Sequence, residues 1–312
     1  MPQLLIPGDH STLLEALQAA AASPLNPTSW ELVVTSATHL ETLPNADTAV
    51  ALPSGTTVTV MPFPSLGRAT VEVVMAAGAT RPLFDVVNSA PSPILQPAST
   101  RPLLSLRDLD LRFFQSDVGV DAGQPWYRGA VVGVRVGAFC RVRIQNCLAL
   151  GTWREHSQTQ PPFEVVREAA ATVFLQAGGN DCTEPYLGIG SQVEIVDSIV
   201  AWFGIGVLAQ GDVRVDCLGT ALIRCAEFGL LQGFGQSGVL VRDGYFLRCG
   251  LGLAMGFNDA PLPSPTPNPP LPATIHRVED TAFSNCHLGV RIEERYTPDQ
   301  NDQPPTTRTL VY

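Results

Sequence analysis

The sequence predicts an all-β fold, a single-stranded right-handed parallel β-helix with a capping helix at its N-terminal end. Three observations predict it: a composition that favours strands, a short internal repeat, and one helical segment near the start. Val, Gly, Thr and Pro are plentiful, whereas Lys is absent and Glu is sparse. These frequencies favour strands joined by many turns. With 312 residues, 45% of them hydrophobic, the chain is long enough to bury a large core.

The repeat is marked by a glycine that follows a Cys and a short apolar stretch. Three segments share this pattern: Cys225-Ala-Glu-Phe-Gly229, Cys249-Gly-Leu-Gly252 and Cys286-His-Leu-Gly289. Residues 143–151 match it with Cys147, and residues 199–206 match it without a Cys. Counted from Gly204, the glycines recur after 25, 23 and 37 residues, and the longest interval contains a Pro-rich insertion at 260–272. Such a period is typical of a solenoid.

Stacked coils place equivalent residues about 4.8 Å apart, so that like side chains form ladders. We therefore predict an inward ladder of small thiols, formed by Cys147, Cys225, Cys249 and Cys286. The preceding residues should form a polar ladder at a corner of each coil, made of Asn146, Arg224, Arg248 and Asn285.

The first 55 residues are predicted to form a cap with the first strands, and residues 56–312 the β-helix. Asp9 and Ser11 are residue types that favour helix N-caps. The apolar residues that follow at helical spacing are Leu13, Leu14, Leu17 and Ala21. Strands are expected at 30–35 and 56–61, with a turn at 53–55 between them.

Two segments resemble the pectin lyase-like superfamily of right-handed β-helices. Gly8 to Ala20 resembles the helix that caps the first coil in that superfamily, and Gly133 to Cys147 resembles its strand, turn and Asn-Cys step. The resemblance covers nearly the whole chain and implies the fold. Among activities, it leaves lyases and epimerases of polyuronides open. The Asn-Thr-Asp and Gly-His-Gly elements of polygalacturonases and the Gly-Arg-Pro-Trp element of pectin methylesterases are missing, which disfavours both activities.

Five loops are predicted, at about 115–128, 152–170, 178–190, 258–273 and 296–308. The last three follow equivalent strands, so they should leave the solenoid on one side, where binding residues often lie. They could equally cover an apolar face or be disordered. Four aromatic residues in the loops could stack on sugar rings or pin the loops to the coil, namely Trp126, Trp153, Tyr127 and Tyr186.

Acidic residues recur on the predicted coils. Asp243 and Asp280 each stand six residues before a ladder Cys, so they should occupy stacked positions on neighbouring coils. Two stacked carboxylates could hold Ca²⁺, and Arg224 or Arg248 could then serve as base or charge clamp in a lyase. The alternative is a row of turn residues whose carboxylates accept hydrogen bonds from local backbone amides. The five histidines show no metal-binding spacing.

The composition restricts the classes of partner and the cellular compartment that are expected for the protein. The net charge is −10, which argues against nucleic acid as the main partner. The absence of Lys excludes Schiff-base chemistry and a P-loop. No stretch reaches membrane-spanning length. Seven Cys without CxxC pairs and no export signal predict a cytoplasmic protein with reduced thiols. A chain that had lost its signal, and is secreted in nature, would look the same.

Two functional hypotheses follow. The first is a carbohydrate-directed protein that binds a polysaccharide along the β-helix and cleaves it by β-elimination or hydrolysis. The second is a non-catalytic scaffold whose loops meet a protein partner. Thr309 to Tyr312 resembles the start of another strand with no cap after it, so the scaffold hypothesis includes oligomerisation through the C-terminal end.

Overall fold

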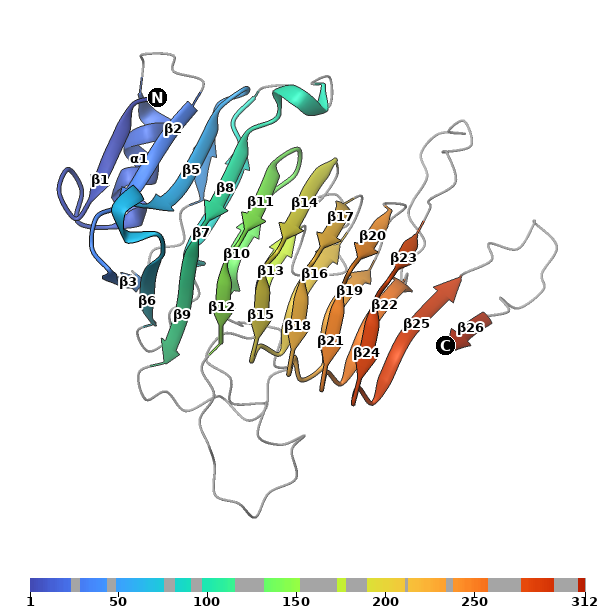
Figure 1. The fold of residues 1–312 in the computed structure, drawn as a ribbon. Helices are drawn as coiled ribbons and strands as arrows, with labels where there is room; N and C mark the ends of the chain where they lie inside the picture. The colour runs from blue at the N-terminus through green and yellow to red at the C-terminus, as the bar shows by residue number, and fades with distance from the viewer. Residues whose placement is uncertain are drawn as a thin grey trace.

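The computed structural model describes residues 1–23, 29–43, 49–75, 82–90, 97–115, 132–151, 173–177, 190–210, 213–233, 238–257, 276–294 and 308–311. It confirms the predicted fold class, because the strands stack into three sheets that run the length of the molecule (Figure 1). Apart from β26 (Arg308–Val311), neighbouring strands within each sheet are parallel, and the chain visits the three sheets in turn, as in a parallel β-helix. One α-helix, α1 (Leu13–Ala22), lies near the N-terminus.

The three sheets are named A, B and C in the order in which the chain enters them. Sheet A contains β1 (Gln3–Ile6), β2 (Ser29–Val34), β5 (Thr57–Pro62), β8 (Leu103–Arg107), β11 (Arg141–Gln145), β14 (Ser191–Val196), β17 (Val213–Leu218), β20 (Val239–Arg242) and β23 (Arg277–Glu279). Sheet B contains β3 (Thr38–Leu43), β6 (Ala69–Met75), β9 (Leu109–Gln115), β12 (Leu148–Leu150), β15 (Ile199–Ala201), β18 (Ala221–Ile223), β21 (Tyr245–Leu247) and β24 (Ala282–Ser284). Sheet C contains β4 (Val50–Leu52), β7 (Phe84–Asn88), β10 (Val132–Val136), β13 (Val173–Ala177), β16 (Ile205–Gln210), β19 (Phe228–Gly233), β22 (Leu251–Phe257), β25 (Leu288–Glu294) and β26 (Arg308–Val311). Short 3-10 turns lie at Pro64–Leu66 and Ala98–Thr100.

The coils turn their corners through residues in the left-handed backbone region. Between sheets A and B this residue has φ between 44° and 59° on six coils, and we call the set the A–B corner row: Asp108, Asn146, Asp197, Gly219, Asp243 and Asp280. Between sheets B and C φ lies between 52° and 68°, and the B–C corner row is Trp202, Arg224, Arg248 and Asn285. Gly, Asn and Asp adopt this conformation most readily, which explains the composition of the first row but not the arginines of the second.

The predicted thiol ladder is correct for three of its four members. Cys225, Cys249 and Cys286 each follow a residue of the B–C corner row, and the Sγ of Cys249 is hydrogen-bonded to both neighbouring thiols. Cys147 instead follows Asn146 at the A–B corner, so placing Cys147 and Asn146 in the ladders of the B–C corner was wrong. The two corners look alike in sequence. At each corner the side chain of a small residue just after the turn donates a hydrogen bond to the backbone carbonyl two residues earlier. Cys147 does so to Gln145 at the A–B corner, as Cys225 does to Ile223 at the B–C corner.

All six described cysteines are free thiols, and five of them are buried. Burial raises the pKa of Cys140 and Cys217 to about 12 and that of Cys147 to about 11. The pKa of Cys286 is raised first by its hydrogen bond with Cys249 and then by burial. These thiols are therefore protonated at neutral pH and serve as small apolar core residues.

The glycine repeat is confirmed with one shift in register. Ile205 pairs with Phe228, Phe228 with Leu251, and Leu251 with Leu288. The next residue in each strand gives an inward row of four glycines: Gly206, Gly229, Gly252 and Gly289. Gly204, which marked the repeat in the sequence, lies two residues before its true equivalent. The row leaves room for aromatic side chains of sheet B, since a Cβ at Gly229 would lie 2.7 Å from Cδ1 of Phe246.

Helix α1 packs against the first coil. Its N-cap is Thr12, whose Oγ1 accepts a hydrogen bond from the Glu15 amide (3.1 Å), and Glu15 Oε2 in turn accepts from the Ser11 amide (3.0 Å). Thr12 as the cap corrects the prediction that Asp9 or Ser11 is the cap, although Ser11 supports the helix start through its bonds to Glu15. The helix residues Leu13, Ala16, Leu17 and Ala20 are buried in the same core as the strand interiors. The predicted Leu14 and Ala21 are only partly buried.

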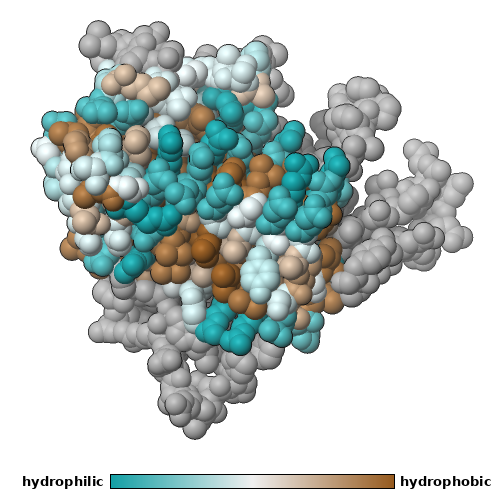
Figure 2. Space-filling model, viewed as in Figure 1, coloured by the Kyte–Doolittle hydropathy of each residue, from teal (hydrophilic) through white to brown (hydrophobic). Residues whose placement is uncertain are grey.

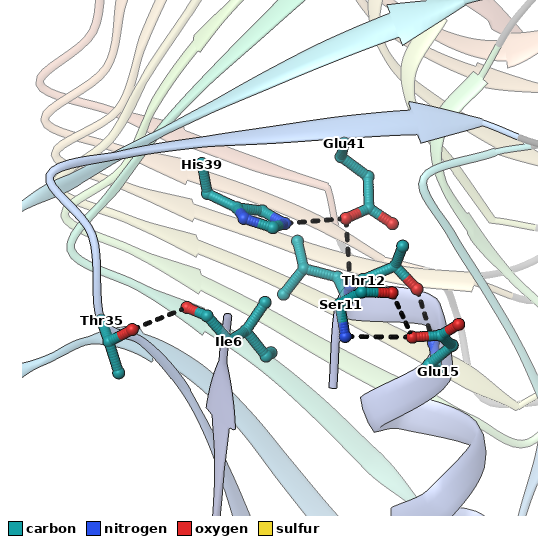
Figure 3. Close-up of polar contacts among 8 residues, drawn as sticks. Ile6, Ser11, Thr12, Glu15, Thr35, His39 and Glu41 are labelled. Atoms are coloured by element: carbon teal, nitrogen blue, oxygen red, sulfur yellow. Dashed lines mark hydrogen bonds and ion pairs between the residues drawn. The ribbon is translucent and has the colours of Figure 1, made fainter. Parts of the chain in front are cut away.

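A buried hydrogen bond from the Leu13 amide to Glu41 joins the first strand of sheet B to the start of this helix (Figure 3). The Glu41 carboxylate lies 3.0 Å from Nε2 of His39, and the same Oε2 accepts the backbone N–H of Leu13 at 3.0 Å. His39 is 5% exposed and Glu41 is 1% exposed. A carboxylate at the N-terminus of a helix is stabilised by the free amides and the helix dipole, so this contact holds α1 on the coil.

The C-terminal strand β26 reverses direction and pairs antiparallel with β25, for example Ile292 with Leu310. A strand at Thr309 to Tyr312 was predicted, and its presence is confirmed for residues 308–311. It folds back along sheet C, however, and does not begin another coil. Among the described strands, β23 and β24 stand at the open edges of sheets A and B. None of the described helices is both long and apolar enough to cross a membrane.

Candidate functional site

The outer face of sheet A carries many exposed charges, and Figure 2 shows hydrophilic patches over it. Ion pairs span neighbouring coils, as between Arg143 and Glu194 (3.0 Å) and between Arg242 and Glu279 (2.8 Å). The hydrogen bond from Arg242 holds the pKa of Glu279 below its usual range. Exposed pairs of this kind add little to stability.

The outer face of sheet C is buried on β10, β13 and β16. Four of its side chains form a second hydrophobic cluster, separate from the core inside the coils: Val132, Val173, Ile205 and Leu208. Each is at most 8% exposed. These three strands therefore offer little surface to a partner, whereas the outward Phe228, Leu251 and Leu288 of the later strands are only partly buried.

Sheet B presents a half-exposed apolar outer face, visible in Figure 2 below the hydrophilic patches of sheet A. Because Val200, Leu222 and Phe246 are buried inside the coils, the residues on either side of each point outward. The outward apolar residues are called the sheet B stripe: Leu148, Leu150, Ile199, Ala221, Ile223, Tyr245, Leu247 and Ala282. Ile199 is 42% exposed and Tyr245 is 40% exposed.

The stripe stacks in register over five coils. Leu148 pairs with Ile199, Ile199 with Ala221, Ala221 with Tyr245, and Tyr245 with Ala282. The side chains therefore form a straight, rigid row along the solenoid.

The sequence analysis did not predict this apolar face, although the sequence contains a pattern that indicates it. Strands of sheet A alternate polar and apolar residues, whereas Leu148–Leu150, Ile199–Ala201 and Ala221–Ile223 are apolar throughout, the pattern of strands covered on both faces.

The two corner rows border the stripe along its length. The A–B corner row supplies carboxylates, and Asp197, Asp243 and Asp280 are exposed. The B–C corner row supplies cations and an indole ring, since the Arg224 guanidinium lies 4.3 Å from the centre of the Trp202 ring. Trp202 was not among the predicted site residues. The face is thus apolar along its middle, acidic along one edge and basic along the other.

The structure brings together some of the predicted site residues and separates others. Asp243 and Asp280 occupy the same position on successive coils, and the Asp243 amide donates to the Glu279 carbonyl at 3.2 Å. Arg224 and Arg248 stack in the same way, with the Arg224 amide donating to the Leu247 carbonyl at 2.7 Å. Strand β21 separates Asp243 from Arg248, however. Five residues of extended chain span about 16 Å, so the two pairs do not converge on one reacting bond.

The stacked carboxylates of Asp243 and Asp280 are candidate metal ligands. Among the described residues, no three His, Cys, Asp or Glu side chains lie close enough together to hold a metal ion. Asp243 and Asp280 are thus a pair without a third protein ligand in the described ranges.

The loop predictions are tested only at their starting points. Residues 178–190, 258–273 and 296–308 follow β13, β22 and β25, all strands of sheet C, so these loops start from one side as expected. The loops at 115–128 and 152–170 follow β9 and β12 of sheet B. Most residues of these loops lie outside the described ranges, including the four predicted sugar-stacking residues Trp126, Tyr127, Trp153 and Tyr186.

Comparison with known proteins gives no match for this chain among protein-family models, curated proteins or solved structures. The three parallel sheets are those of a parallel β-helix.

Proposed function

We propose that the protein is a non-catalytic β-helix scaffold that binds a partner protein along the sheet B stripe. The observation that carries the proposal is the in-register row of half-exposed aliphatic side chains. The largest contiguous apolar patch of a soluble protein is often functional, and a patch rimmed by polar residues suits a protein partner. Aliphatic residues such as Ile199, Ile223 and Leu247 suit a protein surface, whereas sugar-binding faces depend on aromatic rings and hydrogen-bonding groups.

The free energy of burying apolar side chains also favours a partner that covers the stripe. Covering a side chain such as Leu or Ile contributes about 1.5–3 kcal/mol when it passes from full exposure to burial. The stripe residues are already partly buried, so each contributes less, but the row contains eight of them. The rigidity of a stacked sheet reduces the entropy lost on association. Charges at both edges can fix the orientation of the partner.

A triple substitution of the stripe is expected to abolish partner binding without unfolding the protein. Ile199→Glu, Tyr245→Glu and Leu247→Glu add three charges to the apolar face, while their side chains stay outside the core. The tagged protein would be cross-linked in a lysate of its source cells, and the captured proteins identified by mass spectrometry. We expect the wild type to retain a discrete set of proteins that the variant loses.

The matched control places the same three added charges on sheet A, as Gln145→Glu, Gln192→Glu and Leu240→Glu. This control should retain the wild-type set, and circular dichroism should show that both variants are folded. If the stripe variant captures the same proteins as the wild type, the stripe is not the binding face.

The second candidate function is binding of an acidic polysaccharide along the B–C corner row, with cleavage as a further step. It is supported by the resemblance of the sequence to the pectin lyase-like superfamily and by the stacked guanidinium of Arg224 on Trp202. Arginines pair well with carboxylates, and Tyr245 offers a ring on the same face. In this candidate Asp243 and Asp280, at the opposite edge of the stripe, would bind Ca²⁺ to the uronate groups of a polymer that also crosses the stripe.

Electrophoresis through gels that contain polygalacturonate, alginate or neutral dextran tests this candidate. Acidic polymers should retard the wild type in the presence of Ca²⁺, and Arg224→Ala with Arg248→Ala should remove the retardation. The double variant Asp243→Asn with Asp280→Asn should still be retarded, but the retardation should no longer depend on Ca²⁺. Arg143→Ala with Arg214→Ala on sheet A is the control for lost positive charge.

Cleavage is tested separately, because mass spectrometry of the polymers detects unsaturated ends if the protein is a lyase. Unretarded protein and intact polymers would rule the candidate out.

A further inference from the structure

The charges that border the sheet B stripe are arranged so that the stripe complements itself. We propose that the partner of this face is a second copy of the chain, packed face to face with the two solenoids side by side and parallel. This inference rests on the proposed binding role of the stripe and specifies its occupant. It comes from the placement of the two corner rows on opposite edges of one apolar face.

Two rotations can bring one sheet B onto another, and they differ in which edges meet. A two-fold axis parallel to the strands keeps each edge on its own side, so Asp243 and Asp280 would face the same carboxylates of the partner. A two-fold axis parallel to the solenoid axis exchanges the edges. The A–B corner row of one copy then lies over the B–C corner row of the other. Only the second arrangement joins opposite charges.

In the favoured arrangement an aspartate directly faces an arginine on one coil. Asp243 and Arg248 flank the same strand, β21, so Asp243 faces the partner's Arg248 and Arg248 faces the partner's Asp243. On neighbouring coils, Asp280 and the partner's Arg248 are diagonal neighbours. Packed sheets lie about 10 Å apart, a gap that an arginine side chain crosses readily from a corner position. Asp243 and Arg248 are both exposed in the single chain and thus available.

The size of the face sets the strength of the contact. Five strands at about 4.8 Å spacing, with a width of about 16 Å, give roughly 400 Å² per copy. Both copies together bury about 800 Å², which lies below the range of standard protein interfaces. The dimer should therefore be weak and depend on concentration, and its edge charges should decide whether it forms.

Charge reversal at the two facing residues tests the arrangement. Asp243→Arg places two arginines opposite each other at both edges, and Arg248→Asp places two aspartates there. Both positions accept either residue, because Arg224 and Asp197 hold the same left-handed backbone conformation elsewhere in the chain. Sedimentation velocity of the full chain over a concentration series should show a dimer for the wild type. Each single variant should raise the dissociation constant at least tenfold.

Two restorations make the test specific. The double variant Asp243→Arg with Arg248→Asp has its charges exchanged and should dimerise like the wild type. An equimolar mixture of the two single variants should form a heterodimer, since one chain then carries both arginines and the other both aspartates. The control Glu194→Arg reverses a charge on sheet A and should leave dimerisation unchanged.

Two outcomes would overturn the proposal: a wild type that stays monomeric at every concentration, or a dimer that the single variants form as tightly as the wild type. Failure of both restorations would overturn the proposed edge pairing. The capture experiment with the Ile199, Tyr245 and Leu247 variant reports separately on the stripe. A monomeric protein that still loses its partners in that variant would reject the second copy and keep the proposed function.

Discussion

Replacing Glu41 with alanine is expected to lower the free energy of unfolding by about 2–6 kcal/mol, the cost of leaving two buried hydrogen-bonding groups without their partner. The Glu41 carboxylate accepts the Leu13 amide and contacts His39. Its removal leaves a buried imidazole and a buried helix N-terminal amide without their acceptor. Chemical denaturation followed by circular dichroism measures the change. We expect the midpoint to fall without a change in the cooperativity of unfolding.

Two further variants separate the contributions of charge and hydrogen bonding. Glu72→Ala removes a half-buried carboxylate from the outer face of β6, on the neighbouring coil of the same sheet, and should change stability by less than about 1 kcal/mol. Glu41→Gln keeps an acceptor for the Leu13 amide and should cost less than Glu41→Ala. Equal effects of Glu41→Ala and Glu72→Ala would show that the contact does not hold helix α1.

The fold could be predicted because each repeating unit depends on residues that are close together in the sequence. Each coil needs a small or left-handed residue at its corners and an apolar residue at each inward position, so glycines and cysteines recur at a nearly constant period. The helix α1 could be predicted for the same reason, since its spacing and cap lie within a few residues. Errors arose where two sites share one local pattern. Asn146-Cys147 and Arg224-Cys225 both form a left-handed turn followed by a small donor, yet they lie at different corners.

The candidate face could not be predicted from single motifs because it depends on register between coils. Ile199 and Tyr245 lie two coils apart on the same row, and no local feature of either residue indicates that they share a surface. The predicted stacking of Asp243 over Asp280 did follow from the period. The distance between that pair and Arg248 required knowing that a strand of sheet B separates them. His39 and Glu41 were overlooked because their partner, the Leu13 amide, comes from another element.

Substituting alanine for Gly229 is expected to destabilise the protein by about 3 kcal/mol, the upper part of the range for overpacking a core. Gly229 is buried, and an added Cβ would lie 2.6 Å from the Gly252 carbonyl oxygen and 2.7 Å from Cδ1 of Phe246. The first of these atoms belongs to the backbone of the next coil. Relief therefore requires the two coils to separate locally, which weakens the pairing of β19 with β22. Denaturation midpoints measure the loss.

The matched control is Gly244→Ala, also at a buried glycine. Its added Cβ would meet only side-chain atoms, with Cγ1 of Val241 at 2.7 Å and the Thr281 side chain at 3.2 Å. Because no backbone atom of the next coil is among these contacts, we expect a smaller loss of about 1–2 kcal/mol. The background Phe246→Leu removes the ring contact but not the carbonyl contact. If Gly229→Ala costs nothing in that background, the ring alone is the obstacle, and the close approach of the coil backbones does not explain the glycine row.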